Sequence, residues 1–448
     1  MLDKVNNSEK IKIIIAEYVP TLNKGELAIL LGILRTFHIL GLNAEIYVFS
    51  FFPSIDNKRF PREIKPINIL SELKIPNPLL ARKRVINLKI ALSAAIQHML
   101  FLIGYILLGN KMLKIWNRSL WQIYINTDIF IICHDQVSIV YGFGIPFHPI
   151  YISLLGRALK KPIMIYANGT SISRSIITKI LATFVVNFVN LITVRDLESY
   201  LLLQRFLWDK NKLFFTYDPA VLAPSVSNKK IEEIIITEGI PKNKYPLLVG
   251  VDLSFEILSK AYAEKMSLKD SFRRAVVEIA GALDNLVEEF NAYIVFIPHC
   301  IEPYHLRDDR LVAKAIYYAM KRKDRAKVIT REYSAEELKG LMSCFDLIIT
   351  SRVHAALGAL STCVPVCVIA HPSDRRAYGL LSVLNQDIWI FDVRNISSEK
   401  LFNHIKKLIQ SSGEIKNVLN MLVPHARRRA LINGILLKKL LKEYYEKW

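Results

Sequence analysis

The sequence predicts an α/β fold with two Rossmann-like, doubly wound domains that face a cleft. Short, continuous runs of β-branched and apolar residues recur along the chain, and this pattern is typical of buried parallel strands. Enough residues separate successive runs for a crossover helix. With 448 residues, the chain is long enough for two large domains.

The first half of the chain contains six such runs. The first run, IKIIIA, is followed by a loop and by a helix-like stretch that ends near Gly41. Each later run is again separated from the next by residues sufficient for a helix. The six expected strands are residues 11–16, 45–50, 129–133, 162–167, 190–194 and 212–216.

The second half repeats this alternation after a change of composition. Residues 218–246 are rich in Pro, Ser, Asn and Lys, which indicates a domain boundary. We therefore expect one domain over residues 1–225 and a second, with C-terminal helices, over residues 226–448. The expected strands of the second domain are residues 246–253, 292–298, 326–330, 345–350, 364–370 and 388–392.

The composition narrows the possible partners. The chain has 60 Lys and Arg against 40 Asp and Glu, a net charge of +20, and 52% of its residues are hydrophobic. A basic and apolar chain suits an anionic membrane surface, a small anionic substrate or nucleic acid. The basic runs at 321–325, 425–430 and 437–445 lack the interleaved aromatic residues of nucleic-acid modules, so nucleic acid is the least favoured partner.

The cysteine content favours a cytoplasmic protein. Five cysteines in 448 residues are too sparse for a disulfide scaffold, and we read no signal peptide at the N-terminus. Cys363 and Cys367 are four residues apart, but no Cys/His quartet with zinc spacing accompanies them. We therefore expect no metal site.

One apolar segment departs from the pattern of a soluble domain. Residues 90–108 contain no Asp, Glu, Lys or Arg and have basic residues on both sides, within a helical insertion at about residues 85–115. Lys89, Ser93 and Gln97 form a polar stripe on its first half. The segment is interpreted first as a helix packed on its own domain. An interfacial helix on a membrane is the second interpretation, and a true span the third.

The most informative residues follow the expected strand that ends at Thr350. Ser351, Arg352, Val353 and His354 then begin an apolar helix. Backbone N–H groups at a helix N-terminus favour an anion, and an arginine adds a planar fork for carboxylate or phosphate. A histidine can move a proton near neutral pH. The competing interpretation is that Arg352 reaches a surface carboxylate and His354 caps the helix.

Arg195 is a second arginine at a strand end. It directly follows Val194, and Asp196 is a good N-cap for the next helix. We expect Arg195 to point toward the cleft. A local ion pair with Asp196 or Glu198 is the alternative.

Weaker candidates lie in other loops that follow strands. Gly25 lets the backbone approach a ligand, and Asn23 and Glu26 could bind sugar hydroxyls, although an ordinary turn explains this loop equally well. His134 and Asp135 could form a base with its orienting group. Single histidines such as His299 are more often structural. The six residues that we assign to an acceptor site or cleft are Asn23, Gly25, Glu26, His134, Asp135 and His299.

Four motifs in order resemble the polysaccharide pyruvyl transferase family. The stretch SRVHAALGALSTCVPVCVIA, residues 351–370, resembles the family's S-x-R-x-H hallmark with its small-residue helix and following strand. Residues 23–26 match an N-x-G-D/E loop, residues 194–199 a V-R-D-x-x-S segment, and residues 218–220 a D-P-A segment. The order and spacing agree over about residues 11–390.

The resemblance implies a GT-B-like fold and transfer of pyruvate from phosphoenolpyruvate to a sugar, giving a ketal. By this similarity, Arg195 and Arg352 hold the donor, with Ser351 and Val353 beside them, and His354 is the acid–base residue. The donor side is then the C-terminal domain and the acceptor side the N-terminal domain. No cofactor is implied beyond phosphoenolpyruvate as co-substrate.

The expected partners are phosphoenolpyruvate and a sugar or glycolipid acceptor. The basic helices and residues 90–108 suggest peripheral contact with the inner face of a membrane. Two other functions remain open: a GT-B glycosyltransferase that uses a nucleotide sugar, and a non-catalytic membrane-surface protein of the same fold.

Overall fold

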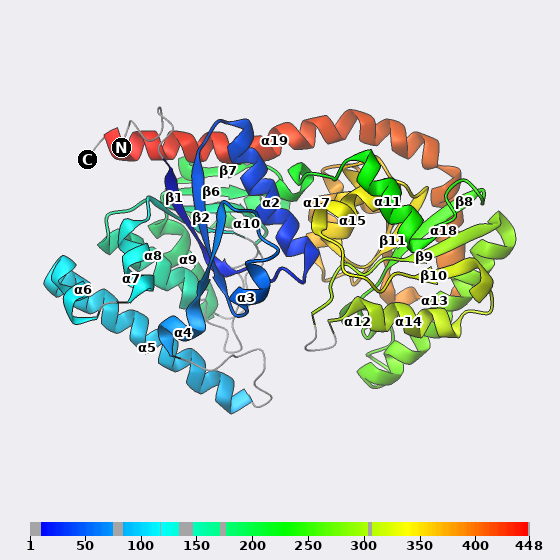
Figure 1. Cartoon of the computed structure of the whole chain (residues 1–448), viewed down its shortest axis with the longest axis horizontal. Helices are drawn as coiled ribbons and strands as arrows, with labels where there is room; N and C mark the ends of the chain where they lie inside the picture. The colour runs from blue at the N-terminus through cyan, green and yellow to red at the C-terminus, as the bar shows by residue number, and fades with distance from the viewer. Residues whose placement is uncertain are drawn as a thin grey trace. The chain divides into compact units, whose positions relative to one another are not determined.

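A computed structural model gives the structure, which describes residues 10–74, 84–116, 118–133, 147–170, 176–302 and 307–446. The chain divides into two compact units, each with one parallel sheet flanked by helices (Figure 1). The first unit comprises Met1–Thr21, Thr36–Asp218 and Arg429–Trp448, and the second comprises Leu22–Arg35 and Pro219–Arg428.

This division differs from the predicted domains. The main boundary falls after Asp218, slightly before the predicted residue 225. Two helices also belong to both units: α2 (Lys24–Ile39) and α19 (Ser412–Glu446) each begin in the second unit and end in the first. Composition along the chain cannot reveal this exchange, because both helices are continuous in sequence.

The sheet of the first unit has seven parallel strands. Its order is β3 (Ile64–Asn68), β2 (Ala44–Ser50), β1 (Ile11–Tyr18), β4 (Ile129–Ile132), β5 (Ile163–Asn168), β6 (Leu191–Val194) and β7 (Leu213–Phe215). Six of these strands coincide with predicted runs. The edge strand β3 was not predicted, because Lys65 and Pro66 interrupt its apolar pattern; edge strands tolerate both residue types.

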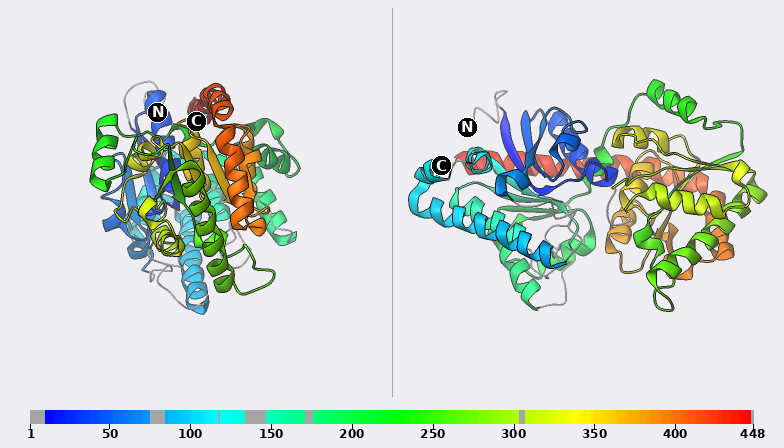
Figure 2. Two further views of the ribbon diagram at one scale, coloured as in Figure 1. Left: turned by 90° about the vertical axis from the view of Figure 1, so that its right-hand side faces the viewer. Right: turned by 60° about the horizontal axis from the view of Figure 1, so that its bottom comes forward.

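Helices on both sides of this sheet bury a large aromatic and aliphatic core. Trp121, Tyr124 and Phe130 are fully buried at its centre. The long helix α5 lies on the outside of the unit (cyan in Figure 2). The helices of this unit are α3 (Pro53–Asp56), α4 (Ile69–Leu73), α5 (Arg84–Leu108), α6 (Met112–Ile115), α7 (Ser119–Asn126), α8 (Phe147–Ala158), α9 (Ile176–Phe188) and α10 (Leu197–Gln204).

The sheet of the second unit has six parallel strands, all predicted. Its order is β10 (Ala326–Val328), β9 (Ala292–Phe296), β8 (Leu247–Asp252), β11 (Leu347–Thr350), β12 (Val366–Ala370) and β13 (Ile390–Asp392). The order reverses between β8 and β11. In open α/β sheets, ligands bind beyond the carboxyl ends of the strands at such a switch point.

Side-chain caps define where several helices of the second unit begin. Ser334 and Glu337 form a reciprocal capping box at α15, and Asp308 caps α14. These helices are α11 (Asn228–Glu238), α12 (Phe255–Leu258), α13 (Leu268–Phe290), α14 (Asp309–Ala319), α15 (Ala335–Met342), α16 (Val353–Leu360), α17 (Arg375–Ser382) and α18 (Ser398–Gln410).

Candidate active site

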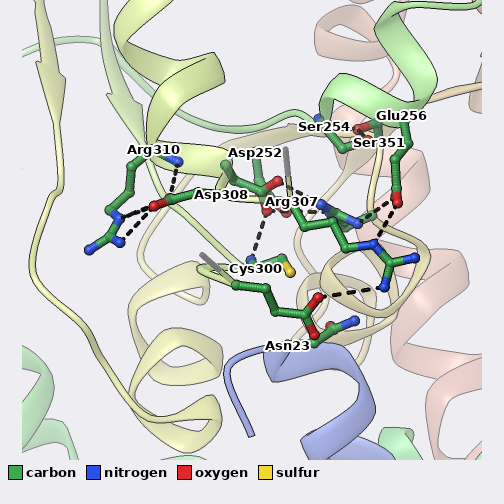
Figure 3. Close-up of polar contacts among 12 residues, drawn as sticks. Asn23, Asp252, Ser254, Glu256, Cys300, Arg307, Asp308, Arg310 and Ser351 are labelled. Atoms are coloured by element: carbon green, nitrogen blue, oxygen red, sulfur yellow. Dashed lines mark hydrogen bonds and ion pairs between the residues drawn. The ribbon is translucent and has the colours of Figure 1, made fainter. Parts of the chain in front are cut away.

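Segments that follow β8, β9 and β11 meet at one edge of the second sheet. Asp252 is the last residue of β8, and the backbone N–H of Ser351, just after β11, donates to its carbonyl oxygen at 2.9 Å. The Ser351 hydroxyl accepts a hydrogen bond from the backbone N–H of Ser254 at 2.8 Å (Figure 3). These hydrogen bonds hold the carboxyl ends of the neighbouring strands β8 and β11 together.

Arg352 is the N-cap residue of α16, and its side chain makes no capping bond. Its guanidinium instead donates to both carboxylate oxygens of Asp309, from Nε at 3.3 Å and from one terminal nitrogen at 2.7 Å. The other terminal nitrogen donates to Glu256 at 3.2 Å. The Arg352 side chain is 15% exposed and that of Asp309 2%, so this bidentate pair is largely shielded from water.

Asp309 hydrogen-bonds with a second buried carboxyl group, Asp252. Burial, together with the charge of Asp309, raises the pKa of Asp252 well above its ordinary value, and burial also raises the pKa of Asp309. Thr350 Oγ1 donates to Asp252 at 3.2 Å, and the backbone N–H of Cys300 donates to Asp309 at 2.7 Å. This arrangement favours one proton shared by the two carboxyl groups, leaving one negative charge opposite Arg352.

The loop at the start of α2 packs against the segment that follows β9. The backbone N–H of Lys24 donates to His299 O and that of Ile301 donates to Leu22 O, both at 3.0 Å. Gly25 then lies directly against His354: a Cβ at Gly25 would be 2.9 Å from His354 Cβ and 3.2 Å from Nδ1. Only a residue without a side chain permits this close approach.

The structure therefore brings together residues that the sequence placed in separate sets. Asn23 forms a bridge with Cys300, its Oδ1 accepts from the backbone N–H of Gly25 at 3.2 Å, and Glu26 lies in the first turn of α2. All three predicted loop residues, Asn23, Gly25 and Glu26, belong to the second unit. They lie in the second unit and not within the first, and their role in acceptor binding stays a prediction.

His299 is a buried, neutral histidine in this site. Burial, and then the charges of Arg352, His354 and Lys24, lower the pKa of His299 to about 3. Within the part of the chain that the structure describes, its Nε2 has no hydrogen-bond partner. A ligand with a hydrogen-bonding group could satisfy this nitrogen. Lys24 is 2% exposed, and its ammonium lies 2.8 Å from Glu332.

A second arginine shares Glu256 with Arg352. Arg307 Nε lies 2.9 Å from Glu256 Oε1, and the Glu256 side chain is 41% exposed (Figure 3). Arg307 also pairs with Glu302 at 3.5 Å. Glu256 is therefore an exchangeable partner, because an incoming anion could take its place between the two guanidinium groups.

Arg195 forms a buried ion pair with Asp218, a residue of another motif. It follows the end of β6, its side chain is 2% exposed, and it donates to Asp218 at 2.8 Å. Asp196 caps α10 as predicted, accepting from the backbone N–H of Ser199. Arg195 belongs to the first unit, whereas Arg352 belongs to the second.

The remaining predicted pair, His134 and Asp135, lies outside the described residues. Sequence reasoning missed Asp252, Glu256 and Asp309. The only available signals were an aspartate that ends a strand and one that opens a helix. Over the described residues, no group of three or more His, Cys, Asp or Glu side chains is arranged to hold a metal ion.

Comparison with known proteins identifies the family. A family model described as polysaccharide pyruvyl transferase matches residues 23–373, which include every site residue predicted from the sequence. The chain belongs to the polysaccharide pyruvyl transferase family. It is therefore a transferase, and the resemblance seen in the four motifs is confirmed.

A curated relative also belongs to polysaccharide synthesis by its name. The chain is 21% identical over 412 residues to the amylovoran biosynthesis protein AmsJ of Erwinia amylovora, covering 90% of this chain and 94% of the relative. The family description and the name of this relative thus both indicate polysaccharide biosynthesis.

Solved structures confirm the GT-B-like fold. A putative UDP-N-acetylglucosamine 2-epimerase from Listeria monocytogenes matches with a TM-score of 0.58 at 12% identity, over 98% of both chains. UDP-GlcNAc 2-epimerase from Neisseria meningitidis matches with a TM-score of 0.56 at 13% identity, over 97% of this chain and all of that one. At such identities the likeness concerns the fold alone.

Proposed function

We propose that this transferase moves the pyruvyl group of phosphoenolpyruvate to a sugar of a polysaccharide, glycan or glycolipid precursor, forming a pyruvate ketal. One observation carries the proposal: in a member of the pyruvyl transferase family, Arg352 and His354 begin α16 at the switch point of the second sheet. An anion-binding fork and a proton donor are the two groups that this reaction requires.

In the proposed donor complex, Arg352 binds the phosphate or the carboxylate of phosphoenolpyruvate. Asp309 holds two of its nitrogens, so the guanidinium is already oriented, and the third nitrogen is shared with the half-exposed Glu256. The donor anion replaces Glu256 at that nitrogen and at Arg307. The backbone N–H groups at the N-terminus of α16 favour an anion at the same place. A part for Arg195 in donor binding stays a prediction of the resemblance.

His354 is the proposed acid–base residue. Its proton adds to the methylene carbon of the donor, which develops positive charge on the adjacent carbon. One sugar hydroxyl forms a C–O bond to that carbon and returns its proton to His354. A second hydroxyl then forms another C–O bond while the bond to the phosphate oxygen breaks, and its proton leaves with phosphate. The products are the ketal and inorganic phosphate, so the atoms balance.

The acceptor is assigned only by class. The family name and the relative in amylovoran biosynthesis support a sugar of a polysaccharide precursor. We propose a cytoplasmic enzyme at the inner face of the membrane, where a lipid-linked acceptor would be available.

The test is a phosphate-release assay with the purified full chain and phosphoenolpyruvate. Lipid-linked and nucleotide-linked sugars serve as acceptors, and nucleotide release is followed in parallel. The proposal expects phosphate release that needs both phosphoenolpyruvate and an acceptor. Nucleotide release without any need for phosphoenolpyruvate would contradict it and favour a nucleotide-sugar glycosyltransferase.

A further inference from the structure

The helix α5 exposes an apolar face from Leu92 to Leu107. Large hydrophobic side chains recur on one side at the spacing of an α-helix, and each is between 42% and 75% exposed. The helix has 25 residues, so it is about 37 Å long. The residues of this exposed face, here called the α5 face, are Leu92, Ile96, Met99, Leu100, Ile103, Ile106 and Leu107.

The opposite side of α5 is packed on the first unit and carries the polar residues His98 and Gln97 beside the apolar residues Phe101 and Leu102. His98 is buried, and its ring nitrogens contact Ala94 O at 2.8 Å and the Tyr124 hydroxyl at 3.3 Å. Gln97 donates to Leu73 O at 2.7 Å and accepts from Arg118 at 2.6 Å. The inward side of α5 therefore includes polar groups that hydrogen-bond within the first unit, while large apolar side chains stay exposed on the other side.

The charged residues of α5 and of the turn that follows it are all basic. Residues 84–116 contain Arg84, Lys89, Lys111 and Lys114 and no Asp or Glu. The three lysines are exposed and lie on both sides of the apolar stretch. A surface with an apolar centre and cations at its ends complements a bilayer with anionic headgroups.

A transmembrane path fits the structure less well. Residues Leu92–Ile115 are long and apolar enough to cross a membrane, and 17% of the tested window is buried. However, Phe101 is fully buried and stacks on Trp121, with ring centroids 4.2 Å apart. Because this side of α5 packs on helix α7 of its own unit, an orientation in the plane of the interface fits the structure better than a span.

We propose that the α5 face binds an anionic lipid surface, with α5 lying in the plane of the interface and its flanking lysines at the headgroups. This surface would hold the enzyme where lipid-linked acceptors lie. Binding requires neither donor nor acceptor, so the inference stands or fails independently of the proposed reaction.

The test is vesicle co-sedimentation of the purified full chain. Vesicles of phosphatidylcholine alone are compared with vesicles that also contain phosphatidylglycerol. We expect at least tenfold stronger binding to the anionic vesicles, weakened by salt. A triple variant, Leu100→Glu with Ile103→Glu and Leu107→Glu, should bind at least tenfold more weakly. Lys111→Gln with Lys114→Gln should weaken binding to anionic vesicles by about fivefold per lysine.

A matched control places the same charges on exposed apolar residues of the second unit: Leu268→Glu, Ile236→Glu and Val277→Glu. This control should bind like the wild type, and circular dichroism should show that both triple variants are folded. Equal binding of wild type and the α5 triple variant would overturn the proposal. A wild-type dimer that the α5 triple substitution dissociates would also overturn it, because the face would then bind a second copy. Retention of the chain in cell membranes after carbonate washing would overturn it too, because that result indicates a span.

Discussion

Arg352 and Asp309 form a bidentate ion pair, with nitrogen–oxygen distances of 2.7 and 3.3 Å, in which the carboxylate is almost completely buried. The pair joins the end of β11 to the start of α14. It orients the guanidinium before any ligand arrives, and such pre-orientation lowers the cost of binding an anion.

Replacing Asp309 should therefore impair donor use. Asp309→Asn leaves one good hydrogen-bond acceptor for Arg352 and removes the negative charge that fixes the plane of the guanidinium group. We expect kcat/KM for phosphoenolpyruvate to fall by about 10- to 100-fold, mainly through a higher KM. Asp308→Asn is the matched control, because Asp308 pairs with Arg310 at the surface and asparagine still caps α14. Equal losses in both variants would argue against a positioning role.

Replacing Glu256 should have the opposite effect. If the donor anion displaces this carboxylate from Arg352 and Arg307, Glu256→Gln removes a competitor. Phosphoenolpyruvate should then bind about two- to fivefold more tightly in calorimetric titrations, since exposed ion pairs are worth little. Glu232→Gln, at an exposed pair with Lys242, should leave the affinity unchanged. Weaker binding by Glu256→Gln would show that Glu256 helps to build the donor site.

A substitution at Gly25 tests whether activity depends on the position of the His354 ring. Gly25→Ala places a Cβ 2.9 Å from His354 Cβ, so the ring or the loop must move. A displacement of about 1 Å can cost on the order of 100-fold in rate, and we expect a fall in kcat of that order. Gly413→Ala has open space around its new Cβ, and it should keep full activity and gain up to about 1 kcal/mol of stability. Full activity of Gly25→Ala would separate this loop from the chemistry.

The buried ring of His299 predicts a pH dependence of stability. Its pKa is about 3 in the folded chain and 6.5 ordinarily, so between these values the unfolded state binds more protons. Stability should therefore fall as the pH drops from 6.5 toward 3. His299→Gln should show a shallower loss in thermal melts between pH 7 and pH 4.5. Burial also lowers the pKa of His98, to about 4, so His98 should still make the His299→Gln variant less stable as the pH falls.

The strands were predictable because their apolar runs are continuous in the chain. The edge strand β3 was not, since Pro66 and Lys65 are acceptable only where one side of a strand is unpaired. The positions of Arg195 and Arg352 just after strands β6 and β11 were predictable for the same reason, because they depend only on where those strands end.

Their partners were not predictable. Arg352 pairs with Asp309 and Glu256 across 43 and 96 residues, and these contacts depend on the strand order, which the sequence does not state. Arg195 and Asp218 lie in two separate motifs of the family resemblance, yet their direct contact appears only in three dimensions. For α5, sequence periodicity could not decide between packing and exposure, because the helix does both on opposite sides.

The central claim is that His354 moves the proton in a phosphoenolpyruvate-dependent ketal synthesis. The most direct measurement is the mass of the acceptor after incubation with phosphoenolpyruvate and wild type, His354→Ala or His425→Ala, whose histidine is exposed on α19. We predict that wild type and His425→Ala add one pyruvate ketal, whereas His354→Ala adds none although it still binds phosphoenolpyruvate. Ketal formation by His354→Ala at the wild-type rate would contradict the account.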